Sequence, residues 1–160
     1  MEICLVRHAI AEERGARFPD DSLRPLTGAG AVKMRVAAQG LQTLVVPEII
    51  LTSPYVRARQ TAEILGEYMS VAVQVEATLA SPDYAGTFEA ALRTKAGRVL
   101  CVGHEPWLSG LLSWLLAGEE GLEVTFRKGA AALVTVARTP ASGVLEWLLQ
   151  PSQLRALAGR

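Results

Sequence analysis

Four short runs of mostly apolar residues alternate with helix-like segments along the first two thirds of the sequence, and this alternation constrains the fold most strongly. The runs cover residues 3–6, 48–52, 71–75 and 99–102. Such runs are typical of strands buried in a parallel sheet, which need helical crossovers to connect them. The sequence therefore predicts an α/β fold, a three-layer sandwich in which helices cover both faces of a mostly parallel central sheet.

The connecting helices are predicted from capping residues and apolar spacing. Thr27 is expected to cap the first helix, and Ser53, which a proline follows, the second. Val32, Val36 and Leu41 lie on the expected apolar side of the first helix. The predicted helices span residues 27–44, 53–69, 88–96 and 107–117.

The last third of the chain has a different pattern. Two β-like runs, 132–137 and 144–149, are joined by the turn-forming stretch 139–143, which is typical of an antiparallel hairpin. Residues 153–160 are expected to form a short surface helix or tail. No linker or repeat interrupts the chain, so we expect one domain covering residues 1–160.

The charge balance limits the expected partners. Sixteen lysines and arginines cancel sixteen aspartates and glutamates, which favours neither a nucleic-acid-coating protein nor one bound to a membrane surface.

The longest apolar stretch, residues 107–117, is shorter than the roughly 20 residues that cross a bilayer, and the N-terminus lacks the pattern of a secretory signal. We expect a cytoplasmic monomer, with Cys4 and Cys101 as buried thiols and a disulfide as the lesser alternative.

Polar side chains follow three of the predicted strands. Arg7 and His8 end the first strand, Ser53 follows the second with Arg57 one helical turn later, and His104 follows the fourth. Ligands of doubly wound sheets bind beyond the carboxyl ends of the strands. We therefore expect these side chains to meet at one edge of the sheet.

Two arginines and two histidines at one edge favour a tetrahedral dianion. Guanidinium groups bind pairs of phosphate oxygens, and a histidine can serve as a donor or as a nitrogen nucleophile. Arg57 and Arg59 lie about 200° apart around a helix, so at most one of them can face the site. Arg57 is closer to the positive end of the helix and is the better candidate.

Other phosphate chemistries lack their motifs in this sequence. No arginine lies six residues after Cys4 or Cys101, the three aspartates form no D-x-D pair, and no lysine has the glycine spacing of a nucleotide P-loop. Two histidines without a C-x-x-C or H-E-x-x-H pattern make a poor metal site. We therefore expect neither a metal nor an organic cofactor.

Three motifs occur in order along the chain. They are L-V-R-H-A at residues 5–9, T-S-P at 52–54 followed by Arg57 and Thr61, and V-G-H-E-P at 102–106. Together they resemble the histidine phosphatase superfamily, which has the phosphoglycerate mutase-like fold. The short chain, the alanine after the Arg-His pair and the R-P-L-T stretch after Asp21 resemble the SixA-type phosphohistidine phosphatases most.

The resemblance implies a hydrolase that carries the phosphoryl group on His8 as a covalent phosphohistidine, which water then releases. Arg7, Arg57 and His104 would bind the phosphate oxygens and stabilise the charge of the transition state. The neighbouring arginines should help keep His8 neutral near pH 7.

The sequence departs from the phosphoglycerate mutase branch of the superfamily, which places a glutamate after the third strand. Residues 77–84 contain only Asp83 as an acid. An imidazole leaves phosphorus without a proton from the enzyme more easily than an alkoxide does, so the expected substrate is a phosphorylated protein histidine. The alternatives are a phosphatase of small phosphorylated metabolites, with Asp83 or Asp21 as the acid, and a non-catalytic phosphate-binding module. Both aspartates suit turns equally well.

Overall fold

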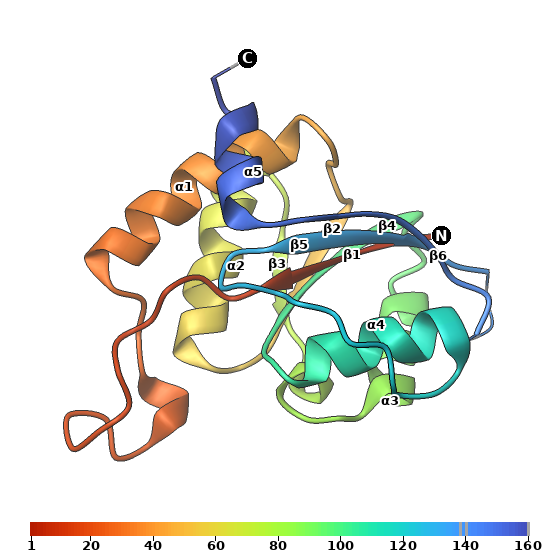
Figure 1. Cartoon of the computed structure of the whole chain (residues 1–160), viewed down its shortest axis with the longest axis horizontal. Coiled ribbons are helices and arrows are strands. Elements are labelled where there is room, and N and C mark those ends of the chain that lie inside the picture. Colours follow the sequence, from red (N-terminus) through yellow and green to blue (C-terminus); the bar gives the residue numbers. More distant parts are fainter. Residues whose placement is uncertain (138, 140, 160) are drawn as a thin grey trace.

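A six-stranded sheet lies between two layers of helices in the computed structural model, which describes residues 1–137, 139 and 141–159 (Figure 1). The strands run in the order β3-β2-β4-β1-β5-β6. The first four strands in the chain are mutually parallel, whereas β5 and β6 are antiparallel to their neighbours. This arrangement confirms the predicted α/β fold. The strands are β1 (Glu2–Arg7), β2 (Ile49–Thr52), β3 (Val73–Val75), β4 (Arg98–Gly103), β5 (Ala131–Thr135) and β6 (Val144–Leu149).

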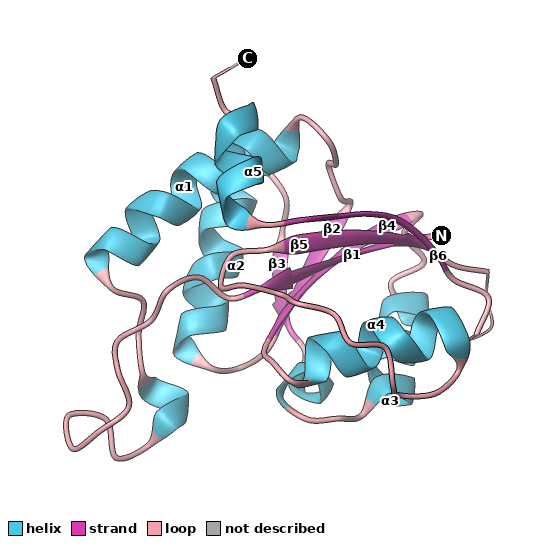
Figure 2. Ribbon diagram, in the orientation of Figure 1, coloured by secondary structure: helices cyan, strands magenta, loops and turns pink. Residues whose placement is uncertain are grey.

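The two faces of the sheet have separate hydrophobic cores, because successive side chains of a strand point to opposite faces. Cys4 and Val6 of β1 pack with one helical layer, and Ile3 and Leu5 pack with the other. Figure 2 shows the two layers on either side of the strands. The first layer contains α1 (Gly28–Gln42), α2 (Val56–Met69) and α5 (Pro151–Leu157); the second contains α3 (Tyr84–Arg93) and α4 (Trp107–Ala117).

The same alternation separates the two cysteines. Cys4 lies in the core under α1 and α2, and Cys101 lies in the core under α3 and α4. Both thiols are free and fully buried, and burial raises the pKa of Cys101 to about 12. The prediction of buried thiols is confirmed, and the disulfide alternative is wrong.

The buried face of α1 differs from the prediction. Thr27 caps the helix as expected, because its Oγ1 accepts a hydrogen bond from the backbone N–H of Gly30. However, Val32 and Val36 are exposed, and Met34, Ala38 and Leu41 are among the residues that face the core. Small residues allow α5 to pack closely on this face: a Cβ at Gly40 would lie 1.8 Å from the carbonyl oxygen of Leu154.

Two helix starts also differ from the prediction. Ser53 and Pro54 do not open α2, which begins at Val56 with no side-chain cap, because the Ser53 hydroxyl is engaged at the sheet edge. Helix α3 begins at Tyr84, earlier than expected, because Asp83 accepts a hydrogen bond from the backbone N–H of Gly86 at 2.9 Å and caps it.

The C-terminal hairpin is confirmed by the antiparallel pairing of β5 with β6. Residue 140 of its predicted connection and residue 160 of the predicted C-terminal helix lie outside the described residues. Helix α5 follows β6 directly, with a proline in its first turn. Among the helices of the described residues, none is long and apolar enough to span a bilayer.

Candidate active site

The register of three parallel strands brings the predicted site residues together. Arg7, the last residue of β1, pairs with Gly103 of β4, so His8 and His104 leave adjacent strands at the same level. The backbone N–H of His8 donates to the carbonyl of Gly103, and that of Ser53 donates to the carbonyl of Val102, both at 3.0 Å. The strand ends therefore form one platform, at the edge where ligands of α/β sheets bind.

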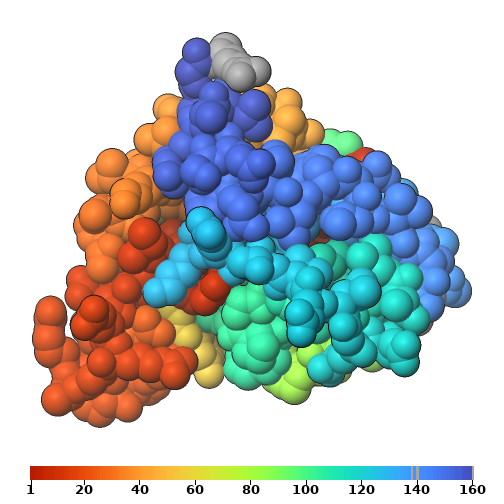
Figure 3. Space-filling view, viewed as in Figure 1, coloured from red at the N-terminus to blue at the C-terminus, as the bar shows by residue number. Residues whose placement is uncertain are grey.

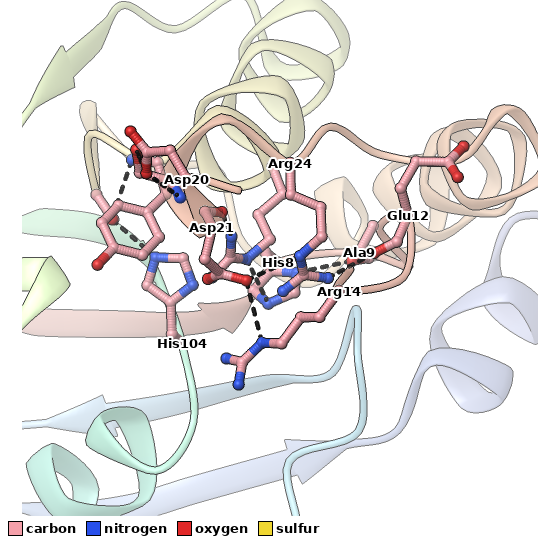
Figure 4. Close-up of polar contacts among 12 residues, drawn as sticks. His8, Ala9, Glu12, Arg14, Asp20, Asp21, Arg24 and His104 are labelled. Atoms are coloured by element: carbon pink, nitrogen blue, oxygen red, sulfur yellow. Dashed lines mark hydrogen bonds and ion pairs between the residues drawn. The ribbon is translucent and has the colours of Figure 1, made fainter. Parts of the chain in front are cut away.

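A cavity of about 360 Å³ opens on this platform. The structure brings all four predicted site residues, Arg7, His8, Arg57 and His104, into its lining. Figure 4 shows His8 and His104 with the polar residues around them. We call this space the reaction cavity. Its other lining residues are Ala11, Glu12, Glu13, Arg14, Arg24, Glu105 and Lys128.

His8 is held in one orientation by a contact on each ring nitrogen. Its Nδ1 lies 2.7 Å from the carbonyl oxygen of Ala9, so Nδ1 carries the proton and donates it there. The Nε of Arg57 donates to the other ring nitrogen, Nε2, at 3.3 Å. Since a guanidinium group can only donate, this network assigns a lone pair to Nε2.

The surroundings of His8 also keep the ring neutral. Its side chain is 5% exposed, and burial lowers its pKa to about 3, with the charges of Arg57 and Arg7 acting in the same direction. The hydrogen bond with the Ala9 carbonyl opposes this shift only in part. At neutral pH, Nε2 is therefore an available nucleophilic nitrogen.

A buried threonine of α2 fixes the backbone beside His8. Thr61 Oγ1 accepts a hydrogen bond from the N–H of Ala9 at 3.0 Å and donates one to the carbonyl of Arg57 at 2.7 Å. The same hydroxyl thus connects the chain segment that orients His8 with the helical turn that carries Arg57.

Asp21 holds the guanidinium group of Arg57. Arg57 is 3% exposed, and its Nη1 and Nη2 donate to the carbonyl and carboxylate oxygens of Asp21 at 2.7 and 2.9 Å. The carboxylate also accepts hydrogen bonds from the Nε atoms of Arg14 and Arg24, each at 3.0 Å. Asp21 therefore connects three arginines of the reaction cavity, Arg57, Arg14 and Arg24.

Arg59, by contrast, is exposed, as the helical spacing predicted.

His104 is oriented by Ser53. Its Nε2 lies 2.8 Å from the Ser53 hydroxyl, which itself accepts a hydrogen bond from the backbone N–H of Tyr55. When the hydroxyl donates its proton to Nε2, the ring proton lies on Nδ1. That Nδ1 is buried without a partner among the described residues, and burial lowers the pKa of His104 to about 3. His104 can therefore donate to a ligand through Nδ1 while remaining neutral.

Arg7 also lines the reaction cavity. Its Nη1 donates to the carbonyl of Phe126 at 2.6 Å, and its Nε is buried without a partner among the described residues. Burial lowers the pKa of Arg7, and the nearby charge of Glu105 opposes that shift. A half-buried guanidinium with a free Nε donor is a ready partner for an oxyanion.

The acidic residues differ most from what the sequence suggested. Asp83 caps α3 and does not line the reaction cavity, so the interpretation as a turn residue holds for it. Glu105 does line the cavity, with Oε1 buried and unpartnered among the described residues. Sequence reasoning missed Glu105 as an acid, although its place directly after His104 was a usable signal.

Two further findings concern Arg14 and Arg17, which lie in the loop after His8, and the arrangement of residues that could bind a metal ion. Arg14 lines the reaction cavity, whereas Arg17 is highly exposed and lies 3.7 Å from a carboxylate oxygen of Glu12. No group of three or more histidine, cysteine, aspartate or glutamate side chains in the described part of the chain is arranged to hold a metal ion.

Comparisons with known proteins find relatives in sequence and in fold. The family model described as histidine phosphatase superfamily (branch 1) matches residues 3–87. An uncharacterized protein of Picosynechococcus is 39% identical over 134 aligned residues, which cover 80% of this chain and 81% of that protein. The phosphohistidine phosphatase SixA of Escherichia coli is 30% identical over 162 aligned residues, 97% of each chain. The solved structure of the protein histidine phosphatase SixA complexed with tungstate has a TM-score of 0.82 and 29% identity, covering 96% of this chain and 99% of that chain.

Proposed function

This chain belongs to the histidine phosphatase superfamily and is a phosphatase, and we propose that it hydrolyses phosphohistidine in proteins through a phosphoryl group carried on His8. The observation that carries the proposal is the state of His8. Its Nε2 bears a lone pair, lies among arginines and lines a cavity of about 360 Å³. A neutral imidazole in a cationic cavity suits attack on the phosphorus of a bound dianion.

The first chemical step transfers the phosphoryl group to the enzyme. The lone pair of His8 Nε2 forms a bond to phosphorus as the bond from phosphorus to the leaving nitrogen breaks. The leaving imidazole keeps that electron pair, and a proton on its other nitrogen makes it a neutral product. The proton stays on Nδ1 of His8, which donates a hydrogen bond to the Ala9 carbonyl, and this contact stabilises the positive charge that develops on the ring.

The second step returns His8 to its starting state. Water attacks phosphorus in line with the bond to Nε2, which breaks and returns its electron pair to Nε2. The proton that the water loses passes to a phosphate oxygen, and inorganic phosphate departs. In both steps Arg7, Arg57 and the Nδ1–H of His104 bind the phosphate oxygens. Such fixed donors, placed where negative charge develops, lower the barrier without having to reorganise.

The choice of a phosphorylated histidine rests on two supports. The relative from Escherichia coli is a phosphohistidine phosphatase, and the related solved structure holds tungstate, a tetrahedral oxyanion like phosphate. In addition, Asp83, the only acid among residues 77–84, lies outside the reaction cavity, which suits a substrate whose leaving group needs no proton from the enzyme.

One observation favours a second candidate, a phosphatase of small phosphate monoesters. Glu105 places a carboxyl group in the cavity lining beside Arg7, and a carboxylic acid could protonate an alkoxide leaving group. Under this alternative Glu105 takes the role that the sequence left to Asp83 or Asp21, since Asp21 is engaged by three arginines.

The test compares kcat/KM for a peptide carrying phosphohistidine with kcat/KM for a panel of phosphate esters. We expect the phosphohistidine peptide to exceed the best ester by at least about a hundredfold, the scale of general acid catalysis that an ester would require. An ester that matches or exceeds the peptide would contradict the proposal and support the second candidate.

A further inference from the structure

A second cavity of about 380 Å³ adjoins the reaction cavity and shares Arg7 and Lys128 with it. We call it the basic cavity. In Figure 3 red N-terminal atoms are visible between orange α1, light-blue residues near 127 and the blue C-terminal segment. Its lining consists of Arg7, Ala9, Ile10, Gly30, Lys33, Met34, Ala37, Arg127, Lys128, Gly129, Pro151 and Arg155.

The walls of the basic cavity carry positive charge that nothing in its lining neutralises. Five of the lining side chains are cationic and none is acidic. Helix α1, residues 127–135 and helix α5 contain no aspartate or glutamate. Among the described residues, Lys33, Arg127, Lys128 and Arg155 form no ion pair within 4.0 Å.

Lys128 lies where the positive charges of the two cavities meet. Burial lowers its pKa and the charges of Arg7, Arg24 and Arg57 lower it further, while the charge of Glu13 opposes the shift. The whole chain has a formal net charge of zero, so this local excess is set by where the side chains lie. An anionic partner would gain attraction here that the average surface does not offer.

The floor of the basic cavity is apolar, which limits the kind of anion that fits. This apolar part of the lining includes Ile10, which is 37% exposed, the half-buried Pro151, and the almost fully buried Met34 and Ala37. A bare phosphate would leave this surface uncovered. A peptide segment that presents acidic and apolar side chains together would contact both the rim and the floor.

We propose that the basic cavity binds an acidic segment next to the phosphorylated residue of a protein substrate. This inference rests on the proposed function, since it places the phosphoryl group in the reaction cavity, which the basic cavity adjoins at Arg7 and Lys128. Lys33 on α1 and Arg155 on α5 attract the flanking acids while the phosphoryl group occupies the reaction cavity.

Binding is tested without any phosphate. A short fluorescein-labelled peptide rich in glutamate and leucine is titrated with the protein at low salt and followed by fluorescence anisotropy. The double variant Lys33→Glu/Arg155→Glu is compared with Arg35→Glu/Arg59→Glu, which makes the same charge change at exposed sites outside the basic cavity. We expect the first pair to weaken binding about tenfold more than the second.

Three outcomes of the titration would overturn the inference. They are no peptide binding, equal weakening by both double variants, and competition by a single-stranded oligonucleotide of equal charge as strong as that of unlabelled peptide. The last result would show that the surface recognises phosphate charge rather than an acidic peptide with apolar side chains.

Rates connect the basic cavity with catalysis. Two phosphohistidine peptides of equal length, one with acidic and one with neutral flanks, are hydrolysed by wild-type protein and by both double variants. For the wild-type protein we expect kcat/KM to be about ten times higher for the acidic peptide than for the neutral one, because KM is lower. For Lys33→Glu/Arg155→Glu we expect the two values of kcat/KM to be nearly equal. A wild-type ratio of one overturns the inference. If neither peptide is hydrolysed, the proposed function fails, and the binding titration still decides whether the basic cavity recognises acidic peptides.

Discussion

Arg57 donates a hydrogen bond from its Nε to the Nε2 of His8 at 3.3 Å, across the gap between the end of β1 and the first turn of α2. The contact identifies Nε2, rather than Nδ1, as the ring nitrogen that faces the reaction cavity. It also places the proposed nucleophile beside the group that would bind the transferred phosphoryl oxygens. The position of Arg57 in turn depends on Asp21, so the geometry of the site relies on a residue outside the strand ends.

The protonation of the two histidines gives the first prediction. Burial lowers the pKa of both His8 and His104 to about 3, so both rings should be neutral at pH 5, where an ordinary histidine with a pKa near 6.5 is charged. Two-bond nitrogen–proton spectra report the tautomers, and the chain has only two histidines to assign. Titration of either ring near pH 6.5 would contradict this account.

The same shifts predict how stability depends on pH. The unfolded chain binds a proton on each histidine below pH 6.5, whereas the folded protein does so only near pH 3. Stability therefore falls as the pH drops from about 6.5 to 3, by up to about 1.4 kcal/mol per pH unit for each histidine. Urea unfolding at pH 7, 6 and 5 measures the slope. We expect a shallower slope for His8→Asn, and an unchanged slope would refute the assignment.

Asp21 is predicted to act by positioning Arg57. Asp21→Asn removes the charge that Arg57, Arg14 and Arg24 share, and we expect kcat/KM to fall by roughly ten- to a hundredfold through misplacement of the guanidinium. Asp20→Asn is the matched control, since the Asp20 carboxylate accepts hydrogen bonds from Ser22 and, within the described part of the chain, pairs with no arginine. Equal losses in the two variants would show that the loop fold, rather than Arg57, is responsible.

Thr61 gives a prediction about stability. Thr61→Val keeps the side-chain shape but leaves the buried N–H of Ala9 without the acceptor that it has at 3.0 Å. We expect a loss of about 1–3 kcal/mol in the free energy of unfolding, the range for a buried donor left unsatisfied. Thr61→Ser retains the hydroxyl and should lose less. Chemical denaturation measures both, and a valine variant as stable as wild type would contradict the role.

Glu105 separates the two candidate reactions. If phosphohistidine is the substrate, Glu105→Gln keeps most of the turnover and binds inorganic phosphate more tightly, because one negative charge leaves the cavity lining. If phosphate esters are the substrates, the variant loses about a hundredfold or more in kcat on them. Steady-state rates and phosphate inhibition constants distinguish the two cases.

The strand ends could be predicted because the sheet follows from local patterns. Apolar runs indicate β1, β2 and β4, and the rule that ligands bind at the carboxyl ends of such strands places His8 and His104 together. Helical periodicity then favoured Arg57 over Arg59. Both predictions use only the spacing of residues within one short strand or helix, and this local spacing is kept in the folded protein.

The remaining features depend on contacts between distant segments. The bond between Asp21 and Arg57 spans 36 positions of sequence, and nothing near Asp21 indicates its partner. Val32 and Val36 were wrongly placed in the core because alanines and glycines, which pack closely against α5, carry little signal in an apolar pattern. The basic cavity likewise joins Lys33 and Arg155 from opposite ends of the chain.

The phosphoenzyme itself is the most direct test of the central claim. The protein is exposed briefly to a labelled phosphohistidine peptide, quenched in base, and mapped by mass spectrometry and phosphorus NMR. The account predicts an acid-labile, base-stable phosphoryl group on Nε2 of His8, absent in a folded His8→Ala variant that has lost turnover. Phosphate on His104, or an active enzyme that never carries phosphate on His8, would contradict it.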